Sequence, residues 1–231
     1  MPPRLYIGTP SYRGSVSVGY TRSLWDTGAM FWRMGITVLP KFVENGAVHI
    51  ARNVLVANFM ASGFSHLAFI DEDVIWRPEA LGRLLAATEQ FADIEVCCGV
   101  YPRKTTPISW PVNPIVDDGG PRLHSGSGFW ELRDACAGFL VLKRAALEKM
   151  MAAYPERKMR IREDTPPDEE PFEYLLFDFF PDVDRRYLTE DHGFSRLWQR
   201  IGGRIWADPG IDLQHVGQHV YTGKLTDLLR G

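Results

Sequence analysis

The sequence has few cysteines and no long apolar run. Its three cysteines, Cys97, Cys98 and Cys136, show no CxxC spacing and give no paired disulfide framework, so we expect a reducing compartment. Cys97 and Cys98 lie in an apolar strand-like run and are expected to be buried free thiols. No stretch reaches the roughly 18 consecutive apolar residues that a membrane-spanning helix needs, and the N-terminus lacks the apolar stretch of a signal peptide. We therefore expect a soluble, cytoplasmic protein, with peripheral contact to a membrane left open.

An excess of basic charge is also missing. The 231 residues contain 26 Lys and Arg against 29 Asp and Glu, a formal net charge of -3. No overall positive field is available to grip nucleic acid, so an anionic ligand needs local basic groups or a metal ion. A hydrophobic content of 45% and a charged content of 24% are ordinary for a soluble domain that buries a substantial core.

The first half of the chain alternates between strand and helix patterns. Strand-like runs and helical periodicity follow one another at 4–12, 21–35, 36–43, 47–63, 66–71, 77–90 and 94–101. Gly63 suits a helix C-cap and Pro78 a first helical turn. This alternation predicts an α/β fold with a mostly parallel sheet, in which ligands bind beyond the carboxyl ends of the strands.

The second half is less regular. Strands around a glycine-serine turn and then a strand entering a helix are expected over 122–150, and a helix over 190–203. Phe194, Leu197 and Trp198 form an apolar face on that second helix. The acidic, proline-rich segment 162–173 reads as a mobile loop. It belongs to a longer loop, 160–184, that either closes over the acceptor after the donor binds or is an unrelated surface excursion.

Three acids end the apolar run HLAFI. Asp71 and Asp73, separated by Glu72, form a D-x-D at a predicted strand end. Carboxylate oxygens are the ligands that Mg²⁺ and Mn²⁺ prefer, and such ions commonly complete their shell with phosphates. The alternative is a solvated acidic turn at the start of the next helix.

Four further positions are candidates for chemistry. Asp191 follows Glu190 at the start of a helix, where an ionised carboxylate suits a general base, unless both are ordinary first-turn acids after Thr189. His215 is either a nitrogen ligand for the same metal or an unrelated histidine.

Arg52 and Gly138 are candidates of a different kind. Arg52 lies on a helix away from its apolar face, so it can reach a phosphate, pair with an acid of the metal site, or simply face solvent. Gly138 allows close approach of a ligand or marks a bulge.

The order of these motifs carries a resemblance. GTPSY, ARN, FIDEDV, CAGFLVLKR, TEDHGFSRLWQRIGG and IWADPGIDLQHVG follow one another over residues 4–217. Together they resemble the GT-A type nucleotide-sugar glycosyltransferases, especially short bacterial and viral members near glycosyltransferase family 2. The resemblance implies one GT-A (Rossmann-like) domain over 1–231, with a nucleotide-binding half (1–115) and an acceptor-side half (116–231). It also implies a smaller mixed sheet in the second half.

The resemblance further implies roles for single residues. Donor-binding positions would be Thr9, Pro10, Ser11, Tyr12, Arg52, Asp71, Glu72 and Gly138, with Glu72 as a ribose contact or a bystander. Asp73, with Asp71 and His215, would hold Mn²⁺ or Mg²⁺ on the diphosphate. Asp191 would be the base of an inverting transfer. The partners would be a nucleotide-diphosphate sugar and a carbohydrate, lipid-linked or protein acceptor, with no nucleic acid.

Other functions compete with this interpretation. A haloacid-dehalogenase-type phosphatase also uses a D-x-D, with Asp71 as nucleophile and Asp73 as acid/base, but its motif usually lies on the first strand. A sugar-1-phosphate nucleotidylyltransferase would need a more basic, glycine-rich first loop than GTPSYRGS. A non-catalytic carbohydrate-binding module would not need Asp73, Asp191 and His215 together.

Overall fold

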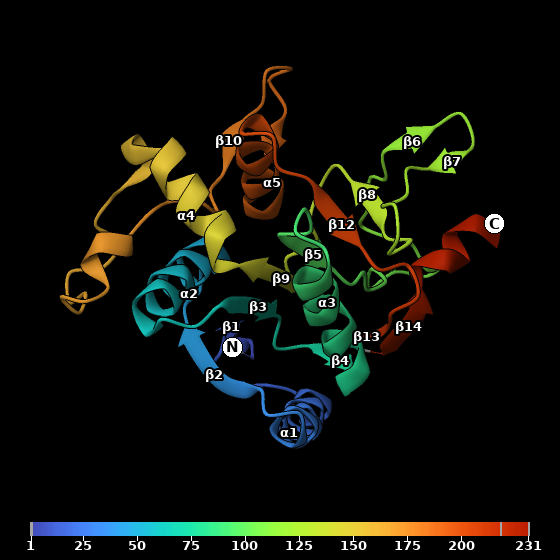
Figure 1. Ribbon diagram of the computed structural model, residues 1–231, viewed down its shortest axis with the longest axis horizontal. Coiled ribbons are helices and arrows are strands. Elements are labelled where there is room, and N and C mark those ends of the chain that lie inside the picture. The colour runs from blue at the N-terminus through green and yellow to red at the C-terminus, as the bar shows by residue number, and fades with distance from the viewer. Residues whose placement is uncertain (1, 218, 231) are drawn as a thin grey trace.

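A seven-stranded sheet forms the centre of the computed structural model, which describes residues 2–217 and 219–230 (Figure 1). The strand order is β2-β1-β3-β9-β5-β12-β8. The strands are β1 Arg4–Ser11, β2 Thr37–Glu44, β3 His66–Ile70, β5 Val96–Cys98, β8 Trp130–Leu132, β9 Phe139–Lys143 and β12 Ile205–Ala207. Five of them run in one direction, whereas β9 and β8 run antiparallel to their neighbours. The predicted α/β fold with a mostly parallel sheet is confirmed.

Helices cover both faces of this sheet (Figure 1). They are α1 Val18–Arg33, α2 Val48–Ser62, α3 Pro78–Gln90, α4 Arg144–Ala153 and α5 Glu190–Arg200. Apolar residues of α2, α4 and α5 pack on one face, and those of α1 and α3 on the other. Strand β3 supplies both cores, because Leu67 and Phe69 point to one face and Ala68 and Ile70 to the opposite one.

Local sequence signals place the helix ends. The Ser17 hydroxyl accepts a hydrogen bond from the Tyr20 backbone N–H at 3.0 Å, which caps α1. Gly63 ends α2 in the left-handed conformation at φ 70°, as predicted, and Pro78 occupies the first turn of α3.

None of the helices in the described residues is both long enough and apolar enough to cross a bilayer. All three cysteines are buried free thiols.

Smaller sheets flank the large one. Strands β4 Val74–Trp76, β13 Asp212–Val216 and β14 Val220–Lys224 form one sheet, while β6 Val116–Asp117 pairs with β7 Gly120–Pro121 and β10 Phe180–Pro181 with β11 Tyr187–Leu188. All of these pairs are antiparallel rather than mixed. Strand β4 comes directly after the D-x-D and pairs with β13, so Val74 lies opposite His215.

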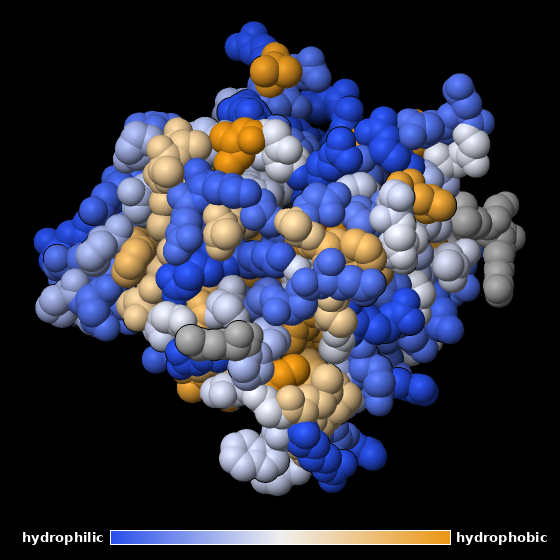
Figure 2. Space-filling view, viewed as in Figure 1, coloured by the Kyte–Doolittle hydropathy of each residue, from blue (hydrophilic) through white to orange (hydrophobic). Residues whose placement is uncertain are grey.

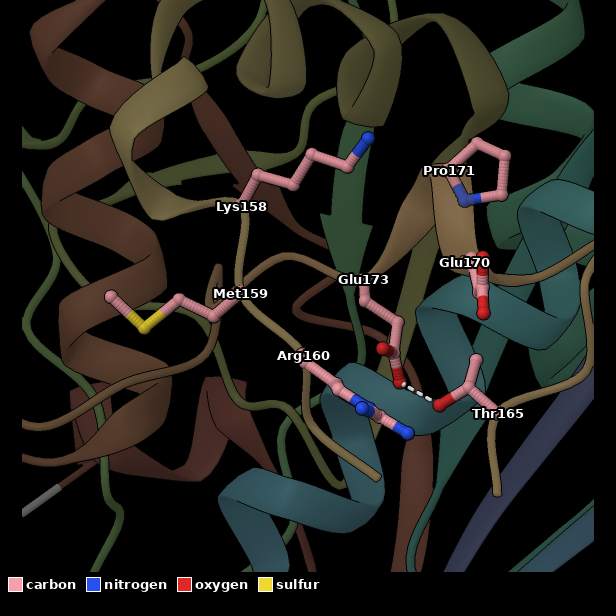
Figure 3. A pocket seen from close by; sticks show the side chains of 7 residues that line it. All are labelled: Lys158, Met159, Arg160, Thr165, Glu170, Pro171 and Glu173. Atoms are coloured by element: carbon pink, nitrogen blue, oxygen red, sulfur yellow. Dashed lines mark hydrogen bonds between the residues drawn. The ribbon is translucent and has the colours of Figure 1, made fainter. Parts of the chain in front are cut away.

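The acidic segment 162–173 is folded against α2. It contains the short helix η2 Glu170–Phe172 and follows η1 Pro155–Arg157; a third, η3 Leu225–Arg230, comes after β14. Glu173 is only 3% exposed and accepts hydrogen bonds from the Thr165 hydroxyl at 2.7 Å and the Ile161 N–H at 3.2 Å (Figure 3). Arg162 lies within ion-pair distance of Glu173. The composition of the segment predicted a mobile loop. Composition does not record that Glu173 is buried and contacts Thr165 and Arg162 of the same segment.

Candidate functional site

A pocket of about 340 Å³ lies where strands β1 and β3 end. Its lining residues are Pro10, Ser11, Tyr12, Asn45, Gly46, Val48, Asp71, Glu72 and Asp73. Strands β1 and β3 are parallel neighbours, with Gly8 opposite Phe69, so the two chain segments that follow them meet at one edge of the sheet. Residues 10–12 and 71–73, which the resemblance assigned to one donor site, therefore line the same pocket. The sequence analysis did not predict that residues 45–48 line this pocket, although they follow the neighbouring strand β2.

Glu72 joins the two sides of this pocket. One of its carboxylate oxygens accepts hydrogen bonds from the Ser11 hydroxyl at 2.5 Å and from the Tyr12 backbone N–H at 3.2 Å. Its backbone carbonyl accepts a third bond from the Ser17 N–H. Thr9 lies behind the pocket wall, fully buried, with its hydroxyl bonded to the Tyr20 hydroxyl.

A buried arginine holds the first acid of the D-x-D. Arg52 is 3% exposed; its Nη2 donates to Asp71 Oδ1 at 2.9 Å and its Nη1 to the Ala137 carbonyl at 3.0 Å. Burial lowers the pKa of Arg52, but the Asp71 and Glu190 carboxylates outweigh it and raise that pKa above its usual value. Of the three roles that the sequence left open for Arg52, the structure supports an ion pair with an acid of the D-x-D, Asp71.

Gly138 lies directly against this pair. Its carbonyl accepts a hydrogen bond from the Asp71 N–H at 3.0 Å. A Cβ built on Gly138 would lie 2.5 Å from Asp71 Oδ2 and would also overlap the Tyr101 hydroxyl. A side chain at this position is therefore excluded unless Asp71 or Tyr101 moves.

Two side chains, the amine of Lys104 and the imidazole of His215, lie beside the Asp73 carboxylate. Lys104 Nζ contacts Asp73 Oδ2, and His215 Nε2 lies 3.5 Å from Asp73 Oδ1. Burial raises the pKa of Asp73, but hydrogen bonds from His215 and Lys104 prevail and hold the pKa below its usual value. Lys104 was missed from the sequence because it lies in an irregular loop without periodicity.

The tautomer of His215 follows from its second contact. His215 Nδ1 lies 2.9 Å from the Pro102 carbonyl oxygen, which can only accept, so Nδ1 carries a proton. In a neutral imidazole, Nε2 then presents a lone pair toward Asp73 Oδ1. Nε2 and Oδ1 lie 3.5 Å apart. No group of three or more His, Cys, Asp or Glu side chains within residues 2–217 and 219–230 is arranged as a metal centre.

Helix α5 delivers the second acidic pair to the same interior. Glu190 Oε1 lies 3.5 Å from Arg52 Nε, and burial raises the pKa of Glu190. Asp191 acts electrostatically on Arg52 and Tyr101, the two residues next to Asp71. Its Oδ1 accepts from the Thr189 hydroxyl at 2.5 Å and from the His192 N–H at 2.8 Å.

Ser195 fixes the position of Asp191. Its buried hydroxyl donates to the Asp191 carbonyl at 2.6 Å and accepts from the Ala135 N–H at 2.9 Å. The start of α5 is therefore tied to the segment that leads into Gly138. Arg52 links the two acidic pairs directly, because it contacts Asp71 of the D-x-D and lies 3.5 Å from Glu190, the neighbour of Asp191.

Comparisons with known proteins establish the fold and not the family. No protein-family model and no curated protein matches the chain. Among solved structures, A197 from STIV is similar with a TM-score of 0.51 at 19% identity, covering 93% of this chain and 86% of that chain. At this identity the similarity shows a shared fold only.

Two other solved structures are more distant. One is a glycosyltransferase involved in the glycosylation of the major capsid of PBCV-1, with a TM-score of 0.39 at 12% identity, covering 73% of this chain and 72% of that chain. The other is S. aureus TarS 1-349, with a TM-score of 0.42 at 10% identity, covering 95% of this chain and 59% of that chain. These scores are too low to support an inference about this chain.

Proposed function

We propose that the protein is a GT-A type glycosyltransferase, near glycosyltransferase family 2, that moves a sugar from a nucleotide-diphosphate donor to an acceptor hydroxyl. The observation that carries this proposal is the pocket in which Tyr12, from the end of β1, faces the Asp71–Asp73 segment. The Tyr12 side chain is 62% exposed and offers an aromatic surface for a nucleotide base. The acids opposite repel a bare diphosphate, so this pairing suits a diphosphate that arrives with a cation.

The proposed cation is Mn²⁺ or Mg²⁺, which Asp73 would hold together with Asp71 and His215. The Asp73 carboxylate, with Asp71 beside it, supplies hard oxygen ligands, and the fixed tautomer of His215 turns Nε2 toward Asp73 Oδ1. The Pro102 carbonyl plays the part of the outer-shell acceptor that orients a metal-binding histidine. A bound divalent cation would neutralise the negative charge that builds on the leaving diphosphate.

Arg52 and Gly138 shape the place of the donor sugar. Arg52 engages Asp71 Oδ1 from inside the protein and leaves Oδ2 on the side of Gly138. Asp71 Oδ2 and the Tyr101 hydroxyl fill the space that a side chain at position 138 would need, so glycine there lets Asp71 keep its place beside the proposed donor sugar. Because the guanidinium is buried, we assign Arg52 a role in positioning Asp71 and not in binding phosphate.

Asp191 is the proposed base. It lies in the first turn of α5. An ionised Asp191 takes the proton of the acceptor hydroxyl as that oxygen attacks the anomeric carbon and the bond to the diphosphate breaks. A single displacement of this kind inverts the anomeric configuration. The acceptor is a hydroxyl on a carbohydrate, a lipid-linked sugar or a protein.

Calorimetry with UDP-, GDP- and dTDP-sugars in the presence of Mn²⁺ or Mg²⁺ tests the proposal. We expect metal-dependent binding of one donor class and slow release of its nucleoside diphosphate. Absence of metal-dependent nucleotide binding across the panel would contradict the proposal and leave the carbohydrate-binding module. Hydrolysis of a chromogenic phosphate ester without nucleotide sugar would instead favour the phosphatase.

A further inference from the structure

A second cavity, of about 730 Å³, opens beside the start of α5. Its polar lining includes Arg133 after β8, Arg186 and Tyr187 from the β10–β11 hairpin, and His192 and Arg196 from α5. We call it the basic cleft. Figure 2 shows strongly hydrophilic side chains over the region between α5 and β8.

The acids of the basic cleft are engaged within the protein. Asp134 is 2% exposed; its Oδ1 lies 2.9 Å from Arg196 Nη1, and its Oδ2 accepts from Asn113 Nδ2 at 2.7 Å. Asp182 Oδ1 accepts the backbone N–H groups of Asp184 and Arg186, both at 2.9 Å. Asp134 is thus paired with Arg196, and Asp182 is engaged by the backbone of its own hairpin.

Two arginines of the same cleft have no such partner. Within the part of the chain that the structure describes, the guanidinium groups of Arg133 and Arg186 form no ion pair and no hydrogen bond. Both residues are exposed and line the cavity together with the His192 imidazole. In a protein with a net charge of -3, this is a local concentration of unpaired positive charge.

The basic cleft adjoins Asp191. His192 lines the cleft, whereas the preceding Asp191 acts on Arg52 and Tyr101 at the D-x-D side. Ser195 ties the Asp191 carbonyl to Ala135, two residues beyond Arg133. The first turn of α5 therefore lines the basic cleft with His192 and places the neighbouring Asp191 where its charge acts on Arg52 and Tyr101 beside Asp71.

We propose that the basic cleft binds the acceptor, and that this acceptor is an anionic saccharide carrying a phosphate or carboxylate group near the reacting hydroxyl. That this saccharide is the acceptor rests on the proposed glycosyl transfer, whereas the preference of the cleft for an anionic saccharide does not. A guanidinium fork pairs bidentately with either anion, and Arg133 and Arg186 are free to do so. Tyr187, which stacks on Phe179, offers a fixed aromatic ring beside these charges.

Saccharide binding measured by saturation-transfer NMR tests the proposal. The probes are glucose 6-phosphate, glucuronate and neutral glucose, each added to the full chain. We expect both anionic sugars to bind at least about tenfold more tightly than glucose, because charge-assisted hydrogen bonds are the strong ones. The tighter of the two identifies phosphate or carboxylate as the preferred group.

Paired arginine variants locate the binding. Arg133→Gln/Arg186→Gln should weaken binding of the anionic sugars about tenfold or more, because both side chains are exposed and unpaired and their loss leaves the fold intact. Arg22→Gln/Arg33→Gln removes the same charge from α1 and should leave binding unchanged. Equal affinity for all three sugars, no binding of any of them, or equal effects of the two double variants would overturn the proposal.

Donor binding on the same samples separates the two hypotheses. If the inference fails and the proposed function holds, the nucleotide sugar binds with metal while the preference for anionic sugars is absent. If the proposed function fails and the inference holds, nucleotide binding is absent while the anionic sugars still depend on Arg133 and Arg186.

Discussion

Arg52 and Asp71 form an ion pair under the floor of the donor pocket, with Arg52 Nη2 at 2.9 Å from Asp71 Oδ1. The guanidinium is almost fully buried, whereas the Asp71 side chain is 27% exposed on the pocket side. One partner of the pair belongs to the core and the other to the site. Stability and binding therefore depend on the same contact.

Replacing Arg52 by Met should destabilise the fold. The change leaves Asp71 and Glu190 without their shared cation, and we expect a loss on the order of 3 kcal/mol in the free energy of unfolding. Urea denaturation measures it. Arg22→Met is the matched control, since Arg22 is exposed and its removal should cost about 0.5 kcal/mol or less. Equal losses in the two variants would show that the buried pair has no special role.

Gly138→Ala should disturb the donor site. The new Cβ would lie 2.5 Å from Asp71 Oδ2, so we expect about 1–3 kcal/mol of destabilisation and loss of donor binding. Gly28→Ala in α1 is the control, because nothing lies within 4 Å of its Cβ and alanine favours a helix. Thermal melts and calorimetry report both effects. Normal donor binding by Gly138→Ala would remove Gly138 from the donor site.

The sequence predicted those features that local patterns encode. Gly63 ends α2 and the apolar face of α5 packs inward, because caps and helical periodicity are properties of neighbouring residues. The sequence could also have predicted that Ser11 lies near Glu72, since Ser11 ends β1 and Glu72 follows β3, its parallel neighbour. The pairing of Glu72 with Ser11 itself was not predicted.

Other features depend on contacts that no local pattern records. The insertion of antiparallel β9 between β3 and β5 is one, because an apolar strand has the same pattern in either direction. Lys104 reaches Asp73 from an irregular loop. The basic cleft collects Arg133, Arg186 and Arg196 from three separate segments, each unremarkable in sequence.

Mn²⁺ binding should respond in opposite directions to changes around Asp73. Asp73→Asn and His215→Gln each remove a proposed ligand and should weaken Mn²⁺ binding at least about tenfold. Lys104→Gln removes the positive charge now on Asp73 and should strengthen it. Electron paramagnetic resonance of free Mn²⁺ measures binding without any substrate. Weaker Mn²⁺ binding by the Lys104→Gln variant would show that the ion does not bind at Asp73.

Asp191→Asn tests the proposed base. The asparagine oxygen can still accept from Thr189 and the His192 N–H, so the helix start should persist. We expect transfer to fall about 10²–10⁴-fold while donor affinity is unchanged, because only proton removal is lost. Product formation and calorimetry on the same protein separate the two. Turnover equal to that of the original chain would exclude Asp191 from this role.

His66 should make stability depend on pH. Burial, and then the positive charge of Lys143, lower its pKa from 6.5 to about 4, although Glu89 Oε1 lies 3.4 Å from Nε2 on the exposed side. Below about pH 6.5 His66 is protonated in the unfolded chain but stays neutral in the folded chain. The free energy of unfolding therefore declines as pH falls toward 4. A pKa lower by about 2.5 corresponds to at most about 3.4 kcal/mol.

Urea denaturation between about pH 7 and about pH 4.5 measures this contribution. His66→Gln should show a flatter decline than the original chain, because glutamine does not titrate and can keep a hydrogen bond to the Thr88 hydroxyl. His219→Gln, at an exposed position, should follow the original profile. If His66→Gln and the original chain decline in parallel, the acid sensitivity lies in other groups and His66 is not a buried neutral histidine of the sheet.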